Sequence, residues 1–380
     1  MSDSGAPASA DDIQLVLAGD VMLGRGIDQI FATHNSPVLD EPHARSALHY
    51  LALAERASGA FTYPVAPDYV WGDALPCLAQ APPDLCIVNL ETAITVADRP
   101  AHKHVNYRMH PANIGTLSAL GVDCCVLANN HVLDWGMDGL LETLDHCAEA
   151  GVATAGAGRS LSEAMAPATL SVPGRARVRV FSLALPTSGV RSSWAAGANQ
   201  PGIAWLADLS PERTTNYIAH IKRWSTPGDL IVVCVHWGPN WGYKVTETQR
   251  RFAHALIERA GVQVVCGHSS HHPKAIERYQ GRAILYGCGD LINDYEGLEG
   301  HQAYRPDLVL LYRLSIAADA ARPADISAWP FRIHRFRLQA ASADEAEWLR
   351  RHLDRECAHF GARLIQRDQR LVLTSGDTPG

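Results

Sequence analysis

Six polar residues of metal-binding types stand where apolar runs of the sequence end. They comprise two carboxylates, one amide and three imidazoles, namely Asp20, Glu91, Asn130, His236, His268 and His271. Mixed oxygen and nitrogen ligands suit Zn²⁺, Mn²⁺ or Fe and suit Ca²⁺ poorly, because Ca²⁺ prefers oxygen alone. Singly, each residue has a simpler explanation, such as a helix N-cap or a satisfied core histidine. Together they predict a centre of one or two divalent transition-metal ions.

The elements that would position these residues are short apolar β-type runs that alternate with helical patterns. The predicted strands are Ile13–Gly19, Asp84–Leu90, Val122–Ala128, Val152–Gly156, Arg177–Leu185, Leu230–His236, Val262–Gly267 and Arg282–Gly287. The predicted helices are Ala112–Leu120, Gly136–Ala150, Pro211–Trp224 and Thr246–Ala260. This alternation predicts an α/β protein with mixed or parallel sheets covered by helices. Ligands bind such sheets at the carboxyl ends of the strands, where the polar residues lie.

Other segments extend this framework. Residues 1–12 are expected to be a disordered N-terminus, and 13–340 to form one domain with an irregular insertion at about 35–69. Within the domain, Leu308–Ser315 and Phe331–Leu338 are predicted to be antiparallel strands. An amphipathic helix is predicted near Ala343–Arg363, within a helix-and-strand appendage at 341–380 packed on the same domain.

Composition excludes several classes of protein. The 380 residues are 47% hydrophobic and 19% charged, with a net charge of −7, so a basic surface for nucleic acid or anionic membrane is not expected. The nine cysteines form no C-x-x-C pair and mostly lie in apolar runs, which predicts a reduced, cytoplasmic protein without a disulfide framework or thiolate zinc site. No signal peptide or long apolar run is visible, so no membrane anchor is expected. The 18 histidines are the one unusual feature.

Five segments, in order from about residue 13 to residue 297, resemble the CapA family. They are Gly19–Arg25, Asn89–Thr92, Ala128–His131 with Asp134 and Gly136, His236–Gly238, and Gly267–His268 with Pro273. CapA proteins are associated with bacterial poly-γ-glutamate capsule synthesis and are related to calcineurin-like metallophosphoesterases. The resemblance implies a four-layer α/β/β/α sandwich with metal at one sheet edge. It also implies hydrolysis of phosphoesters or amides.

The resemblance also implies roles for individual residues. Asp20 would bind the first metal, and Glu91 would stand where metallophosphoesterases place a bridging Asp. Asn130, His236 and His268 would hold the second metal, and His131 would protonate a leaving group. His271 or His272 would be the last ligand.

One departure from the metallophosphoesterase pattern affects the first metal. Met22 replaces a metal-binding His, and a thioether is a poor ligand for such ions. The first site is therefore expected to be weak, filled by other groups or empty.

Residues beside the expected ligands have alternative roles. Asp134 could orient His131 and raise its pKa, or cap the helix near Gly136. Asp290 could hydrogen-bond a ligand histidine or cap a turn.

Three further groups are candidates for substrate binding. Arg25 could neutralise an anionic substrate or a developing oxyanion, or form a surface salt bridge. Arg108 could clamp a carboxylate or phosphate, or form a structural ion pair. Trp237 and Tyr243 could form a wall of a substrate pocket, although core packing is the preferred explanation for Trp237.

Two functions are therefore expected to compete. The first is a metal-dependent hydrolase acting on a small anionic phosphoester or γ-glutamyl amide. The second is a non-catalytic factor that binds or assembles a glutamyl polymer, and a fold with a degraded site is a third. The sequence does not specify the substrate, the metal, the number of ions or the oligomeric state.

Overall fold

The computed structural model describes residues 12–317 and 322–375, so the expected N-terminal tail lies outside it except for Asp12. A ten-stranded sheet has the order β19-β20-β17-β16-β1-β2-β5-β6, with β15 beside β1 and β18 beside β17. Its strands are β1 (Ile13–Val21), β2 (Leu85–Leu90), β5 (Cys124–Val126), β6 (Ala153–Ala155), β15 (Asp290–Ile292), β16 (Leu308–Ile316), β17 (Asp325–Ile333), β18 (Leu338–Ala340), β19 (Ala362–Arg367) and β20 (Arg370–Ser375).

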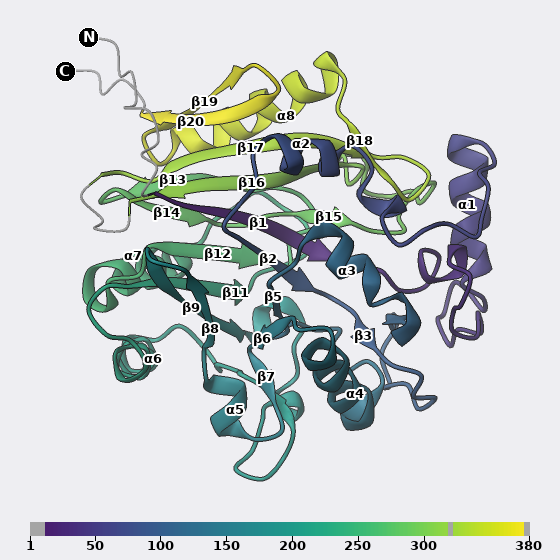
Figure 1. Ribbon diagram of the computed structural model, residues 1–380, viewed down its shortest axis with the longest axis horizontal. Helices are drawn as coiled ribbons and strands as arrows, with labels where there is room; N and C mark the ends of the chain where they lie inside the picture. The colour runs from purple at the N-terminus through teal and green to yellow at the C-terminus, as the bar shows by residue number, and fades with distance from the viewer. Residues whose placement is uncertain (1–11, 318–321, 376–380) are drawn as a thin grey trace.

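A second, six-stranded sheet has the order β13-β14-β12-β11-β9-β8 (Figure 1). Its strands are β8 (Ala168–Val172), β9 (Ala176–Ala184), β11 (Asp229–His236), β12 (Val264–His268), β13 (Ile276–Tyr279) and β14 (Arg282–Leu285). Two short pairs complete the strands, namely β3 (Ala93–Ile94) with β4 (Arg108–Met109), and β7 (Ala157–Gly158) with β10 (Gly202–Ile203).

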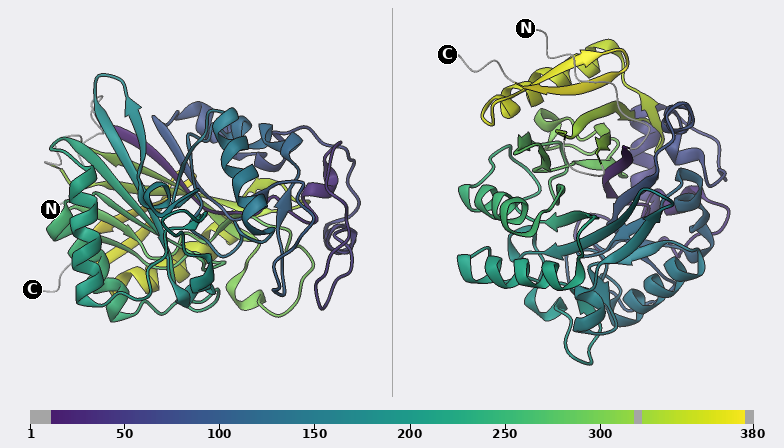
Figure 2. Two further views of the ribbon diagram at one scale, coloured as in Figure 1. Left: turned by 90° about the horizontal axis from the view of Figure 1, so that it is seen from below. Right: turned by 60° about the vertical axis from the view of Figure 1, so that its left-hand side comes forward.

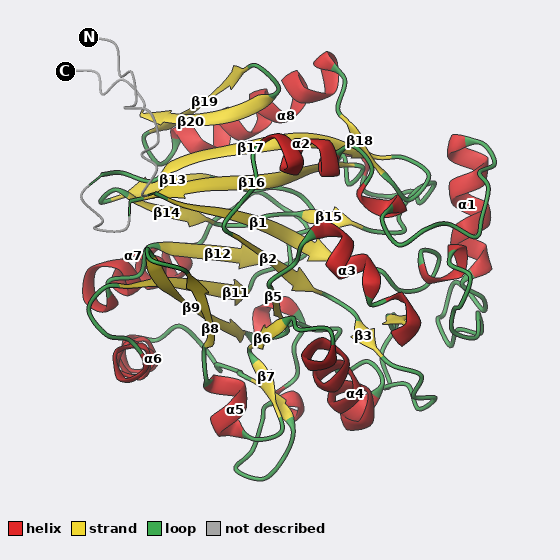
Figure 3. Cartoon of the chain, in the orientation of Figure 1, coloured by secondary structure: helices red, strands yellow, loops and turns green. Residues whose placement is uncertain are grey.

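Most of the helices cover the outer faces of the two sheets (Figure 3), whereas the last one packs into the apolar layer between the sheets through Leu349, Leu353 and Cys357. The helices are α1 (Leu48–Ser58), α2 (Ala74–Gln80), α3 (Gly115–Leu120), α4 (Gly136–Glu149), α5 (Leu161–Met165), α6 (Pro211–Trp224), α7 (Glu247–Ala260) and α8 (Ala343–Ala358). Side chains of α1 to α4 pack on the larger sheet, and those of α6 and α7 pack on the smaller one. None of the helices within the described ranges is both long enough and apolar enough to cross a bilayer.

The alternation of side chains along the strands builds three apolar layers. Val16 and Ala18 of β1 face the helices, whereas Leu15 and Leu17 face the second sheet. A third apolar cluster lies between the smaller sheet and α6 and α7. The strands accordingly lie between helices on both sides (Figure 2, right). This arrangement confirms the α/β/β/α sandwich.

The central strands of both sheets run parallel to their neighbours. In the larger sheet β1, β2, β5 and β6 are parallel, and in the smaller sheet β9, β11, β12 and β14 are parallel. Parallel strands present their carboxyl ends at one edge. The polar residues that follow five of these strands are therefore brought to one edge of the sandwich.

Three boundaries differ from the sequence-based prediction. The insertion expected to be irregular contains α1, whose first turn has no side-chain cap and hence no recognisable start signal. The second antiparallel strand is Asp325–Ile333, because Arg335 and Phe336 adopt positive φ of 56° and 53° and end the extended run. The last helix ends at Ala358, just before Gly361, whose φ is 67°.

Candidate functional site

Asp20, Glu91 and His236 meet where β1, β2 and β11 end. Their ligand atoms all lie within 4.8 Å of one another, and all three residues are buried. Asp20 is within β1, Glu91 directly follows β2, and His236 is the last residue of β11. These atoms form an oxygen- and nitrogen-rich group that could hold a cation.

Asp20 also belongs to a second group of the same size, with His271 and Asp290. Asp290 opens β15, and its backbone is in parallel register with Asp20. The hydrogen bond predicted for Asp290 is present, because His271 Nδ1 lies 2.8 Å from Asp290 Oδ1. Two neighbouring groups of three ligands thus share the Asp20 carboxylate. We call these five residues, Asp20, Glu91, His236, His271 and Asp290, the edge cluster.

Asn130 lies beside the edge cluster, as predicted. Its Oδ1 is 3.1 Å from His236 Nε2, and the same nitrogen lies 3.9 Å from Glu91 Oε1. The other ring nitrogen of His236, Nδ1, is buried and makes no hydrogen bond to any residue that the structure describes. Nε2 is therefore the ring nitrogen that an ion between Asn130, Glu91 and His236 would bind.

Two asparagines that the sequence analysis did not select hold the carboxylates in place. Asn89 Nδ2 donates to Asp20 Oδ1 at 2.8 Å and to Glu91 Oε2 at 3.1 Å. Asn129 Nδ2 in turn donates to Asn89 Oδ1 at 3.1 Å and to the Leu90 carbonyl at 2.8 Å. Both residues were visible in the selected segments, next to the expected ligands, but nothing in their spacing distinguished a supporting amide from a ligand.

Asp134 holds the ring of His131, which was one of its two predicted roles. His131 Nδ1 is 2.6 Å from Asp134 Oδ2, while His131 Nε2 lies 3.9 Å from Glu91 Oε1. The cap of α4 is Trp135, so Asp134 does not occupy that position. Lys103, which the sequence analysis missed, donates to Asp134 Oδ1 at 2.7 Å and to the Asn130 carbonyl. His131 and Asp134 therefore form a buried pair, and the Lys103 ammonium binds the other oxygen of the Asp134 carboxylate.

Burial determines how these groups ionise. It lowers the pKa of His131 to about 4, which outweighs the opposing effect of Asp134, and it lowers the pKa of His236 to about 3. Burial together with the charge of Asp20 raises the pKa of Glu91 well above its usual value. For Asp20, burial acts against ionisation, but the neighbouring His268 outweighs it and lowers the pKa. Asp20 is thus the anion of this group.

The adjacent histidines His271 and His272 differ in what their ring nitrogens contact. His272 Nδ1 lies 3.1 Å from the Pro273 carbonyl, and His272 Nε2 accepts from the Gly242 amide at 3.1 Å. Both nitrogens are therefore engaged by backbone. His271 instead faces Asp290 and Asp20, so the geometry favours His271 over His272 as a ligand.

His268 and Met22 are both buried near Asp20. His268 Nδ1 is 3.3 Å from Asp20 Oδ1, and its ring is grouped with two cysteines rather than with Glu91 and His236. Met22 is fully buried, with its sulfur 3.9 Å from Tyr295 Oη. The first metal site was expected to be weak, filled by other groups or empty. The geometry fits the second of these outcomes, because His271 and Asp290 lie beside Asp20.

Arg25 does not have the free guanidinium that a substrate clamp requires. It is 5% exposed, and it donates to Asp294 Oδ1 at 2.5 Å and to Glu41 at 3.3 Å. Its guanidinium also stacks on Tyr50 and Tyr107. Arg25 lines the cavity described below, but two carboxylates already balance its charge, so the structure shows the ion pair expected as its alternative role, buried rather than on the surface.

The residues expected to bind substrate lie elsewhere. Arg108 stacks on Trp135, 3.7 Å from the ring centroid, and lines a different hollow of about 600 Å³. Trp237 is a core residue that donates to the Tyr286 carbonyl at 3.1 Å, which corrects its candidate role as a pocket wall. Tyr243 packs on His272 and Tyr304 behind the cavity described next.

A cavity of about 830 Å³ opens beside the edge cluster. Its wall includes Asn130, His131 and His271, so it reaches the candidate ligands. The aromatic residue of the loop after β11 that lines it is Trp241, which stacks on His301 with ring centroids 3.9 Å apart. A solute in this cavity would contact His131, Asn130 and, of the edge cluster, His271.

Comparison with known proteins supports the resemblance seen in the sequence. A family model described as bacterial capsule synthesis protein PGA_cap matches residues 14–295. A probable polyglutamine synthesis accessory protein of Mycobacterium tuberculosis is 43% identical over 367 residues, which cover 95% of this chain and 96% of the relative. The PGA biosynthesis protein CapA of Bacillus subtilis is 26% identical, over 80% of this chain and 69% of that protein. The capsule biosynthesis protein CapA of Bacillus anthracis is 24% identical, over 75% and 60%. The chain therefore belongs to the PGA_cap family of bacterial capsule synthesis proteins.

Proposed function

We propose that this protein is a metal-dependent hydrolase that acts on a small anionic phosphoester or γ-glutamyl amide. The observation that carries the proposal is the position of Asp20, which is shared by two groups of three ligands at the end of a large cavity. Paired ligand groups that share a carboxylate are suited to two neighbouring ions.

The side chains fit one or two divalent transition-metal ions such as Zn²⁺, Mn²⁺ or Fe. One ion would be held by Asp20, Glu91, Asn130 and His236, and the other by Asp20, His271 and Asp290. The ionised Asp20 carboxylate supports this assignment, and so does His236 Nε2, which faces both Asn130 Oδ1 and Glu91 Oε1. A divalent ion supplies Lewis acidity, which lowers the pKa of water and polarises phosphoryl or carbonyl oxygens. In this arrangement Asp20, rather than Glu91, would be the residue common to both ligand sets.

His131 is the proposed proton carrier. Its Nδ1 proton is held by Asp134, which leaves Nε2 directed toward Glu91 and free to take up a proton. An anionic substrate in the cavity would favour protonation of the ring, and the Nε2 proton could then pass to the leaving group. The Lys103 ammonium forms an ion pair with Asp134 and offsets its negative charge. The imidazole of His131 therefore does not experience the full charge of that carboxylate.

The names of the relatives support a second candidate function. They describe an accessory protein of polyglutamine synthesis and biosynthesis proteins for PGA or capsule, without stating a reaction. The alternative is therefore a non-catalytic factor that binds or assembles a glutamyl polymer. In that case the cavity would bind polymer, and the edge cluster would be structural.

One experiment distinguishes the two candidates. The protein is purified without chelator, its metal content is measured, and hydrolysis of p-nitrophenyl phosphate, bis-p-nitrophenyl phosphate and a γ-glutamyl anilide is assayed. The hydrolase proposal predicts bound transition metal and turnover of at least one substrate, both reduced in Asn130→Ala and His236→Ala. A metal-poor protein whose activities do not change in either variant would overturn the proposal and favour the assembly factor.

A further inference from the structure

Behind the edge cluster, strands β11 and β12 present a second set of ligand-type side chains. Cys234 and Cys266 are register partners, and two residues further along His236 and His268 are also partners. Because strand side chains alternate, all four point to the same face of the sheet. That face is the space between the two sheets, where both cysteines are 1% exposed.

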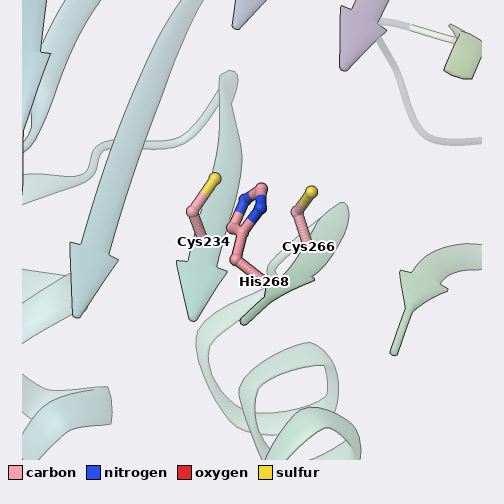
Figure 4. A group of neighbouring side chains, drawn as sticks. All are labelled: Cys234, Cys266 and His268. Atoms are coloured by element: carbon pink, nitrogen blue, oxygen red, sulfur yellow. The ribbon is translucent and has the colours of Figure 1, made fainter. Parts of the chain in front are cut away.

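His268 lies between the two cysteine side chains (Figure 4). The Sγ atoms and one ring nitrogen lie within 4.8 Å of one another. The imidazole is 2% exposed; its Nδ1 faces Asp20 Oδ1 at 3.3 Å, and its Nε2 makes no hydrogen bond to any residue in the described ranges. A buried polar atom without a partner is costly, so an unpartnered ring nitrogen beside two thiols indicates that a ligand belongs there.

We propose that Cys234, Cys266 and His268 bind a zinc ion in a buried structural site that is separate from the edge cluster. Two sulfur donors and one imidazole match the ligands of structural zinc sites, which are tetrahedral and closed to solvent. Cys288 lies next to the group, with its Sγ 3.2 Å from Cys266 Sγ, and would have to move to become a fourth donor because it is not within 4.8 Å of all three other donor atoms. Binding would replace the thiol protons and would link the two strands just behind the proposed active site.

Asp20 would then connect the two sites. His268 Nδ1 faces Asp20 Oδ1 at 3.3 Å, which leaves the other ring nitrogen for the ion. Histidine ligands of metals commonly pair their second nitrogen with a carboxylate in this way, and the pairing fixes the orientation of the ring. His268, expected from the sequence to bind in the oxygen-rich site, is thereby assigned to the sulfur site.

The two cysteines Cys266 and Cys288 also allow a competing outcome. Their sulfurs are close enough that a small movement would permit a disulfide, which would remove a thiolate from the site. Counting the free thiols of the denatured protein distinguishes the cases. The proposal predicts all nine cysteines to be free, and a shortfall of two assigned to Cys266 and Cys288 would overturn it.

The test uses the full chain, stripped of metal and reloaded with Co²⁺. Thiolate coordination to Co²⁺ produces a charge-transfer absorption in the near ultraviolet, which oxygen and nitrogen ligands do not. We expect this band in the wild type and in Cys147→Ala, a buried cysteine in a different apolar cluster. The band should disappear in Cys234→Ala and in Cys266→Ala.

The same spectra separate this proposal from the proposed function. Asn130→Ala and His236→Ala should keep the band, because neither residue contributes sulfur. A wild-type spectrum without the band would overturn the zinc site even if the cysteine variants failed to fold. A band that survives both cysteine substitutions would also overturn it.

Discussion

The edge cluster and the cysteine pair meet on strand β11, where His236 and Cys234 are two residues apart, yet the two groups offer different ligand atoms. At the strand ends, carboxylates and imidazoles stand beside a cavity of about 830 Å³. Two residues back, Cys234 and Cys266 are enclosed between the sheets. The comparison shows two neighbouring buried groups of different chemistry: a set of oxygen and nitrogen donors that reaches the cavity through His271, and a set with two sulfur donors that does not line it.

Asp20→Asn is expected to have the largest effect, because Asp20 is common to both ligand groups of the edge cluster. Activity should fall to background, since both ions lose the carboxylate that they share. The Co²⁺–thiolate band should persist, because no sulfur is lost. Asp123→Asn, which precedes β5 at the opposite edge of the sheet, is the control and should keep activity. Equal loss of activity in both variants would contradict the assignment.

His131→Ala should separate catalysis from metal binding. Turnover should fall by about 10²–10⁴-fold, the usual contribution of a proton-transfer group, while metal content stays that of the wild type. Activity is measured with the best substrate found, together with metal analysis of the same sample. Loss of metal in this variant would make His131 a ligand instead.

Asp290→Asn should have a smaller effect than the two preceding substitutions. It should lower metal affinity in the edge cluster only. Asparagine keeps an oxygen that could still bind the ion but loses the carboxylate that supports His271, and loss of such a carboxylate typically lowers metal affinity by about 10–100-fold. Competition with a fluorescent chelator measures that affinity. His272→Gln is the matched control, because both ring nitrogens of His272 contact backbone. A metal affinity that falls more in His272→Gln than in Asp290→Asn would reverse the assignment of the two neighbouring histidines.

The smallest expected effect is a pH dependence of the free energy of unfolding. Burial lowers the pKa of His272 from 6.5 to about 4, so between these values the unfolded chain binds a proton that the folded chain does not. The free energy of unfolding should therefore decrease as pH falls from 6.5 to 4, with this residue contributing a slope of up to about 1.4 kcal/mol per pH unit. Urea unfolding of metal-free protein should give a shallower slope for His272→Gln. Identical slopes would show that His272 does not titrate in this way.

The sequence predicted the strands of the sandwich and the edge at which the ligands meet, because apolar runs and the polar residues that end them are visible in one dimension. The expected ligand Asp20 and the His131–Asp134 pair are examples. The register between two strands, which determines which of their residues are neighbours, cannot be read from the sequence in this way. Cys234 and Cys266 are 32 positions apart in sequence and became neighbours only through the pairing of β11 with β12.

Burial explains most of the remaining differences between the predicted roles of residues and their roles in the structure. Arg25 and Trp237 are residue types that also occur in binding sites, but their partners Asp294 and Tyr286 come from distant parts of the chain. Lys103 was overlooked because its loop has no regular pattern, although its ammonium reaches both Asp134 and Asn130. Such contacts depend on tertiary packing, which local spacing does not encode.

The central claim is tested most directly by counting transition-metal ions per chain in protein purified without chelator, for the wild type and for Asp20→Asn. Inductively coupled plasma mass spectrometry gives this count. The account predicts that the wild type carries more metal than Asp20→Asn, since the variant loses the shared ligand of the edge cluster and keeps the cysteine site. Equal metal content in the two proteins, or none in the wild type, would contradict it.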